Sequence, residues 1–164
     1  MTIHIKEVKG ASDLNAVRVL FQEYANSLAF DLSFQDFEKE LKSLPGRYAF
    51  PEGCLLIAQN QDGSVGCGAV RKINDGVCEM KRLFVRPEFR GIGIGRRLAM
   101  KIIRIAVSSG YFRMRLDTTP FMNEATSLYR SLGFYDIEPY CYNPVSGAVF
   151  LELDLGTFED EIRT

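Results

Sequence analysis

A glycine-rich segment between a strand pattern and a helix pattern is the feature that most constrains this chain. Glycines stand at positions 91, 93 and 95 within Arg90–Arg97. The apolar pattern of Val77–Val85 predicts a strand before this segment, and Ile92–Ala106 predicts an amphipathic helix after it. Glycine has no Cβ and tolerates positive φ, so backbone N–H groups can converge on an anion at the helix N-terminus. The segment therefore predicts a strand, loop and helix unit that binds a ligand carrying phosphate.

The spacing of the glycines separates this loop from other phosphate-binding loops. A P-loop places Lys and then Ser or Thr after its last glycine, whereas Arg96 and Arg97 stand there. A dinucleotide fingerprint needs its third glycine where Arg96 stands, although Asp117 lies where a ribose-binding acid would be expected. A glycine turn without a ligand is the third alternative. Alternate glycines flanked by arginines are more than such a turn requires.

The rest of the chain alternates strand and helix patterns. Further strands are expected over residues 2–8, 54–59, 65–73, 112–116 and 148–153. Two helices are expected between Ser12, as the cap of the first, and Pro45, which ends the second, and another over 123–132. This order predicts an α/β fold with a mixed sheet and helices on both faces, in a single domain over 1–164.

Charge and cysteine usage argue against several classes of function. The chain has 20 Lys and Arg against 21 Asp and Glu, so nothing favours a general affinity for nucleic acid. Its four cysteines show no CxxC pair, and His4 is the only histidine, so we expect no metal site. No apolar run is long enough to span a membrane, and the first residues do not resemble a signal peptide. We therefore expect a cytoplasmic protein with scattered buried thiols.

The motif Arg90-x-x-Gly93-x-Gly95 resembles the acetyl-CoA signature of the GNAT superfamily of N-acetyltransferases. The resemblance extends to Glu79–Pro87 before the loop, to Ala125–Phe134 after it, and to the order of elements. It implies a GNAT-like acyl-CoA N-acyltransferase fold, in which a mostly antiparallel sheet contains a splayed pair of strands. It also implies that acetyl-CoA is the cosubstrate, and that its acetyl group passes to a primary amine of a small molecule or protein by direct attack in a ternary complex.

The resemblance further implies which residues bind the cosubstrate. In this family the strand before the loop pairs with the pantetheine arm, the loop N–H groups hold the pyrophosphate, and the residue that opens the later helix contacts the arm. A bulge near Leu83 and Phe84 would leave a backbone N–H free to polarise the thioester carbonyl. These roles fall on Leu83, Phe84, Val85, Arg90, Gly91, Ile92, Gly93, Ile94, Gly95, Arg96 and Asn123. The alternative for Asn123 is an N-cap of the helix that it opens.

Two side chains carry the chemistry that the resemblance implies. Glu79 matches the strand position that many family members use for a general base, and the alternative is a solvated strand residue. Tyr129, four residues before Gly133, matches the family's proton donor to the CoA sulfur. The alternative for Tyr129 is a ring packed on the sheet.

The segments that bind the acceptor amine vary within this family. Here they contain aromatic residues and no cluster of acidic or basic side chains. Tyr48, Tyr140 and Tyr142 lie in loop segments and are the candidates for lining an acceptor site. Homodimers are common among relatives, so a homodimer would fit the resemblance. The alternative to an enzyme is a catalytically idle acyl-CoA-binding sensor or interaction module on the same fold. Retention of both Glu79 and Tyr129 favours the enzyme.

Overall fold

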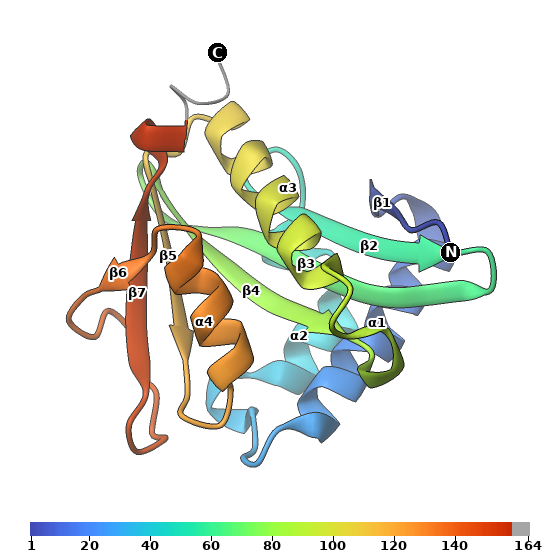
Figure 1. Ribbon diagram of the computed structural model, residues 1–164, viewed down its shortest axis with the longest axis horizontal. Coiled ribbons are helices and arrows are strands. Elements are labelled where there is room, and N and C mark those ends of the chain that lie inside the picture. The colour runs from blue at the N-terminus through green and yellow to red at the C-terminus, as the bar shows by residue number, and fades with distance from the viewer. Residues whose placement is uncertain (159–164) are drawn as a thin grey trace.

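A seven-stranded sheet flanked by helices forms the body of the computed structural model, which describes residues 1–158 (Figure 1). Its elements are β1 (His4–Glu7), α1 (Gly10–Ser27), the 3₁₀ helix η1 (Ser33–Gln35), α2 (Phe37–Ser43), η2 (Gly46–Tyr48), β2 (Cys54–Asn60), β3 (Gly63–Asn74), β4 (Val77–Val85), η3 (Pro87–Phe89), α3 (Ile94–Ser108), β5 (Arg113–Thr118), α4 (Asn123–Ser131), β6 (Tyr135–Asp136) and β7 (Val149–Asp154). The strand expected over Val77–Val85 is confirmed with the same bounds. Within the described part of the chain, no helix has the length and apolarity needed to cross a membrane.

Two expected helix starts were wrong, and one short strand was not expected. Helix α1 begins at Gly10, before Ser12, and the backbone N–H of its N-cap Lys9 donates to Asp13 Oδ2 at 2.9 Å. Helix α3 begins at Ile94 and not at residue 92, because Gly93 before it is left-handed, with φ of 89°. Strand β6 was not expected, since a pair of residues is too short to show a period of two.

The order of strands in the sheet is β1-β2-β3-β4-β5-β7-β6, and every neighbouring pair is antiparallel except β4 and β5. The parallel pairing of β4 and β5 covers only Val77–Glu79 against Arg113–Arg115. Strand β4 continues to Val85 and β5 to Thr118, so the two strands separate beyond Glu79. This is the splayed pair that the resemblance implied.

Helices cover both faces of the sheet and bury a separate core on each side (Figure 1). Strand β2 contributes to both cores, because successive side chains of a strand point to opposite faces of the sheet. Leu56 and Ala58 pack in the core that contains α3 and α4, whereas Leu55 and Ile57 pack in the core that contains α1 and α2. The sheet is therefore a central layer that holds the ends of β4 and β5 between two sets of helices.

A bulge interrupts the ladder between β3 and β4. Cys67 pairs with Phe84 and Ala69 pairs with Lys81, so Arg82 and Leu83 together face the single residue between Cys67 and Ala69. Arg82 has a φ of 60°, which is uncommon for a residue other than glycine. The bulge contains Leu83, in the region that the resemblance implied.

Candidate active site

A groove of about 580 Å³ runs past the end of β4 and the N-termini of α3 and α4. Most of the residues expected to bind the cosubstrate line it: Leu83, Phe84, Val85, Arg90, Gly91, Gly93, Ile94, Gly95 and Asn123. The side chains of two others lie elsewhere. Ile92 is 57% exposed, and Arg96 donates from Nη1 to Ser131 Oγ at 2.9 Å.

The glycine loop leaves its backbone open to this groove. Gly91 and Gly93 have φ values of 84° and 89°, and a Cβ on either would meet no other atom within 4 Å. The first hydrogen bond of α3 runs from the Arg97 N–H to the Gly93 carbonyl at 3.1 Å, and the N–H groups of residues 91–96 have no backbone acceptor among residues 1–158. Free N–H groups at a helix N-terminus form a favourable site for an anion such as pyrophosphate.

A small polar cavity lies at the inner end of the groove, between the splayed strands. Tyr24, Leu83 and Met122 line both spaces. The cavity has a volume of about 30 Å³, enough for a water molecule. Its polar walls are formed by Gln35, Lys81, Arg82, Asp117, Thr119, Tyr129 and Asn143.

Tyr129 reaches this cavity from α4. The residue is 6% exposed, and its ring packs against Phe134 with centroids 5.7 Å apart. Among residues 1–158, no group forms a hydrogen bond with its hydroxyl. Burial, together with the nearby Tyr24 and Asp117, raises the pKa of the Tyr129 phenol. The phenol therefore stays protonated at neutral pH and is available as a donor to a ligand in the cavity.

Glu79 lies near the cavity, with both carboxylate oxygens bound by neighbours. The residue is 3% exposed, Arg71 Nε donates to its Oε1 at 2.8 Å, and the Tyr140 hydroxyl donates to its Oε2 at 2.6 Å. Burial by itself would raise the pKa of Glu79, but Lys81, Arg71 and the Tyr140 hydroxyl bring that pKa below its usual value. Glu79 is thus ionised, each of its oxygens accepts one hydrogen bond, and its role as the general base stays a prediction.

Two buried cations on β4 continue this network. Arg82 binds Glu40 through two parallel contacts, from Nε to Oε2 at 2.9 Å and from Nη2 to Oε1 at 3.0 Å. Lys81 Nζ donates to Gln35 Oε1 at 3.0 Å and lies 3.9 Å from Asp117 Oδ1. Burial lowers the pKa of Lys81, and the carboxylates of Glu79 and Asp117 oppose that effect.

Reasoning from the sequence did not select Lys81, Arg82 or Gln35 as site residues. One signal was present, because Glu79, Lys81 and Arg82 are charged residues inside a strand whose other residues are mostly apolar. Charged residues are seldom fully buried unless they are paired, so such a strand indicates a polar site.

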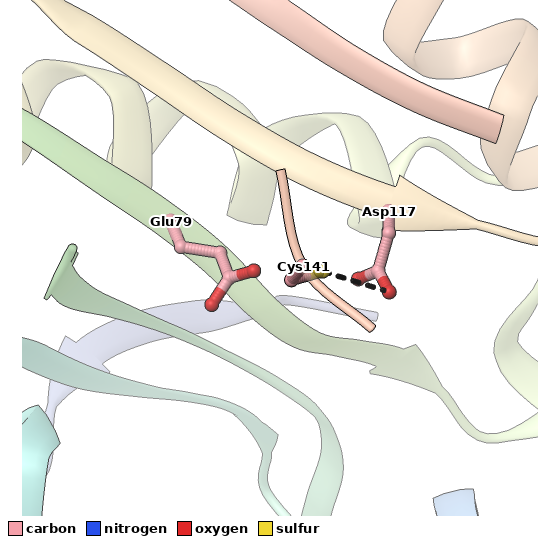
Figure 2. Close-up of side chains that lie close together, drawn as sticks. All are labelled: Glu79, Asp117 and Cys141. Atoms are coloured by element: carbon pink, nitrogen blue, oxygen red, sulfur yellow. Dashed lines mark hydrogen bonds between the residues drawn. The ribbon is translucent and has the colours of Figure 1, made fainter. Parts of the chain in front are cut away.

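Figure 2 shows Glu79 and Asp117 extending from β4 and β5 toward the same space, with Cys141 beside them. One ligand atom from each of the three lies within 4.8 Å of the others, and Cys141 Sγ lies 3.8 Å from Asp117 Oδ2. Burial, Asp117 and Glu79 raise the pKa of the Cys141 thiol to about 12, so it is protonated at neutral pH. The Glu79 oxygens are already bound, and Lys81 places a cation beside Asp117. We therefore interpret these residues as part of the ion-pair network.

The segment before β7 contacts the cavity and its acidic residues, and Asn143 lines the cavity directly. Tyr140 binds Glu79, Asn143 Nδ2 donates to Asp117 Oδ2 at 3.0 Å, and Tyr142 packs edge-on against Phe34 at 6.2 Å. Of the three tyrosines expected on the acceptor side, Tyr140 and Tyr142 therefore lie in this segment.

Tyr48 does not line the groove or the cavity. The residue is 3% exposed and packs edge-on against Phe21 with centroids 6.1 Å apart. The 3₁₀ helix η2 turns its ring into the core beneath α1, which the loop-like sequence around Pro45 did not indicate.

Residues 16–134 match the family described as the Acetyltransferase (GNAT) family. An uncharacterized N-acetyltransferase of Schizosaccharomyces pombe is 40% identical over 155 residues, which cover 93% of this chain and 95% of the relative. N-acetylaspartate synthetase of Danio rerio is 33% identical over 107 residues, which cover 63% of this chain and 38% of that protein. The solved structure of yncA from Salmonella typhimurium with its cofactor acetyl-CoA is similar in fold. Its TM-score is 0.74 at 18% identity, over 93% of this chain and 94% of that one.

Proposed function

This chain belongs to the GNAT family of acetyltransferases, and we propose on that basis that it transfers the acetyl group of acetyl-CoA to a primary amine of a small molecule or protein. One observation carries the proposal: a groove with a glycine loop at a helix N-terminus leads between splayed strands to a polar cavity that contains Tyr129. The yncA structure, which contains acetyl-CoA, supports the choice of cosubstrate.

The residues of the groove fit the parts of acetyl-CoA. Free N–H groups at Gly93–Gly95 would bind the pyrophosphate, and Arg90 adds positive charge beside them. Beyond Glu79 the backbone of β4 is no longer paired with β5, so it can form hydrogen bonds with the amide groups of the pantetheine arm. The bulge at Arg82 and Leu83 is the place where a free N–H would polarise the thioester carbonyl.

The proposed reaction is direct attack of the amine on the thioester. The amine nitrogen forms a bond to the carbonyl carbon, the carbon–sulfur bond breaks, and the Tyr129 hydroxyl gives a proton to the departing sulfur. The proton lost by the amine goes to a carboxylate, either directly or through a water molecule. Glu79 is our first candidate for that base, and Asp117 is the second because it lies on the cavity wall.

A thiol-release assay with acetyl-CoA and a panel of amines tests this function. We expect release that depends on the amine and forms the acetylated product. Amino acids belong in the panel, because one relative is named N-acetylaspartate synthetase. Binding of CoA without turnover of any amine would instead support the alternative, an idle acyl-CoA-binding sensor or interaction module. A single domain over 1–164 and a cytoplasmic location are further proposals from the sequence.

A further inference from the structure

Lys81 differs from the neighbouring cations Arg71 and Arg82 in its distance to a carboxylate. Arg71 and Arg82 each lie within 2.9 Å of a carboxylate oxygen, whereas the closest described carboxylate to Lys81 is Asp117, at 3.9 Å. The Lys81 side chain is only 6% exposed, and among residues 1–158 its one acceptor within hydrogen-bond distance is the neutral Gln35 amide. A buried ammonium without a close anion is unfavourable, and burial accordingly lowers its pKa. An anionic group of a ligand would remove this cost.

Thr119 supplies an independent sign of a missing ligand in the same cavity. The residue is 3% exposed, and its Oγ1 is buried without a hydrogen-bond partner among the described residues. Buried hydroxyls are normally bonded, so an unbonded one on a cavity wall indicates a partner that binds there. Both Lys81 and Thr119 can donate to a ligand oxygen.

Asp117 gives the cavity a negative group next to this positive one. Its carboxylate accepts a hydrogen bond from Asn143, lines the cavity and lies near Glu79 (Figure 2). An amine that is to be acetylated arrives largely as an ammonium ion, which a carboxylate would bind. The cavity therefore offers neighbouring sites for an anion and for an amine.

We propose that the acceptor is an α-amino acid, with its carboxylate bound by Lys81 and Thr119 and its amine beside Asp117. The 3.9 Å between Lys81 Nζ and Asp117 Oδ1 matches a ligand whose amine and carboxylate are separated by one carbon. This inference rests on the proposed acetyl transfer and specifies its acceptor. Because the cavity has a volume of about 30 Å³, an amino acid can enter only if part of the cavity lining moves, and Asn143, which belongs to that lining, is bonded to Asp117.

Matched pairs of acceptors test the proposal directly. Each pair consists of an α-amino acid and the amine that lacks only its carboxylate, such as phenylalanine and phenethylamine. We expect wild type to favour the amino acid in kcat/KM by roughly 10- to 100-fold, the range that hydrogen bonds to a charged group supply. Lys81→Met should bring this preference close to one, Thr119→Val should reduce it in part, and Lys81→Arg should retain it.

An exposed lysine provides the matched control. Lys72 lies on β3 with its ammonium paired to Glu52 and Asp75 at the surface, so Lys72→Met should keep the wild-type preference. Thermal melts and CoA titrations would check that each variant folds. If Lys81→Met does not fold, the preference of wild type together with that of Thr119→Val decides the question.

The outcomes separate this inference from the function on which it rests. Absence of thiol release with every amine would reject acetyl transfer itself. Release without any preference for the carboxylate would overturn the inference and leave acetyl transfer standing. Equal losses for both members of each pair in Lys81→Met would also overturn it, because Lys81 would then act on the reacting groups and not on the carboxylate.

Discussion

The hydroxyl of Tyr140 donates a hydrogen bond of 2.6 Å to Oε2 of Glu79 and so links the segment before β7 to the middle of β4. Because Arg71 on β3 donates to the other oxygen at 2.8 Å, the Glu79 carboxylate joins three separate parts of the chain. A carboxylate in this position has a structural role whether or not it also removes a proton from the acceptor.

The first prediction concerns the stability that Glu79 contributes. Its pKa is lower in the folded protein than in the unfolded chain, where Glu has a pKa of about 4.3. The contribution is therefore fully present above that value and is lost as pH falls through the lower folded pKa. Glu79→Gln should melt below wild type at pH 7, and the gap should narrow as pH falls below about 4. Thermal melts across this range would measure the gap, and a constant gap would contradict the prediction.

The second prediction concerns the base. Glu79→Gln should lower kcat by roughly 10²-fold near neutral pH and remove the acidic limb of the pH–rate profile, with acetyl-CoA affinity little changed. Tyr140→Phe is the control, since it removes a hydrogen bond to Glu79 but keeps the carboxylate. If Asp117→Asn removes that limb and Glu79→Gln does not, the base is Asp117.

The third prediction concerns the loop. Gly93→Val should weaken binding of CoA, because the added side chain would project into the open groove where the pyrophosphate is expected. Gly110→Val is the matched control, because Gly110 has a similar φ of 91° and equally open surroundings but lies outside the groove. Calorimetric titration with CoA would compare the two. Equal losses of affinity would indicate that backbone strain, and not the groove, is responsible.

The fourth prediction concerns Tyr129. Tyr129→Phe keeps the ring against Phe134 and removes the proton, so folding and CoA binding should change little while kcat falls by roughly 10-fold or more. The loss should be smaller with an acyl donor whose thiol leaves more easily. Tyr135→Phe removes a hydroxyl that binds Glu152 at the surface and should leave kcat near wild type. A lower melting temperature with unchanged kcat would make Tyr129 a packing residue.

The fifth prediction compares two ion pairs. One joins Arg82 of β4 to Glu40 of α2, and the other joins Arg86, just after β4, to Glu23 of α1. Glu40→Gln leaves Arg82, whose side chain is 2% exposed, without its carboxylate and should cost about 3 to 5 kcal/mol of stability. Glu23→Gln breaks the pair with Arg86, whose side chain is 27% exposed, and should cost about 1 kcal/mol or less. Denaturant unfolding of both variants would measure the difference, and similar costs would contradict it.

The sequence by itself determined the features that depend on near neighbours along the chain. Strand β4 has its predicted bounds because alternation and the turn before it are local. The glycines at 91 and 93 have positive φ, as a loop of that composition favours. Together with Tyr129 and the order of elements, these patterns carried the resemblance to the GNAT family, and that resemblance implied the splayed sheet.

Only the tertiary structure decided which side chains meet and whether their polar atoms are already bound. Lys81 and its partner Gln35 are 46 residues apart, so nothing local indicates their contact. Tyr48 and Tyr140 both looked like loop residues, yet packing buries one against Phe21 and places the other on Glu79. Burial and hydrogen bonding are set by segments that become neighbours only on folding. That is why the sequence predicted the phosphate-binding loop, whereas the structure alone gave the cavity, its buried cation and its unbonded hydroxyl.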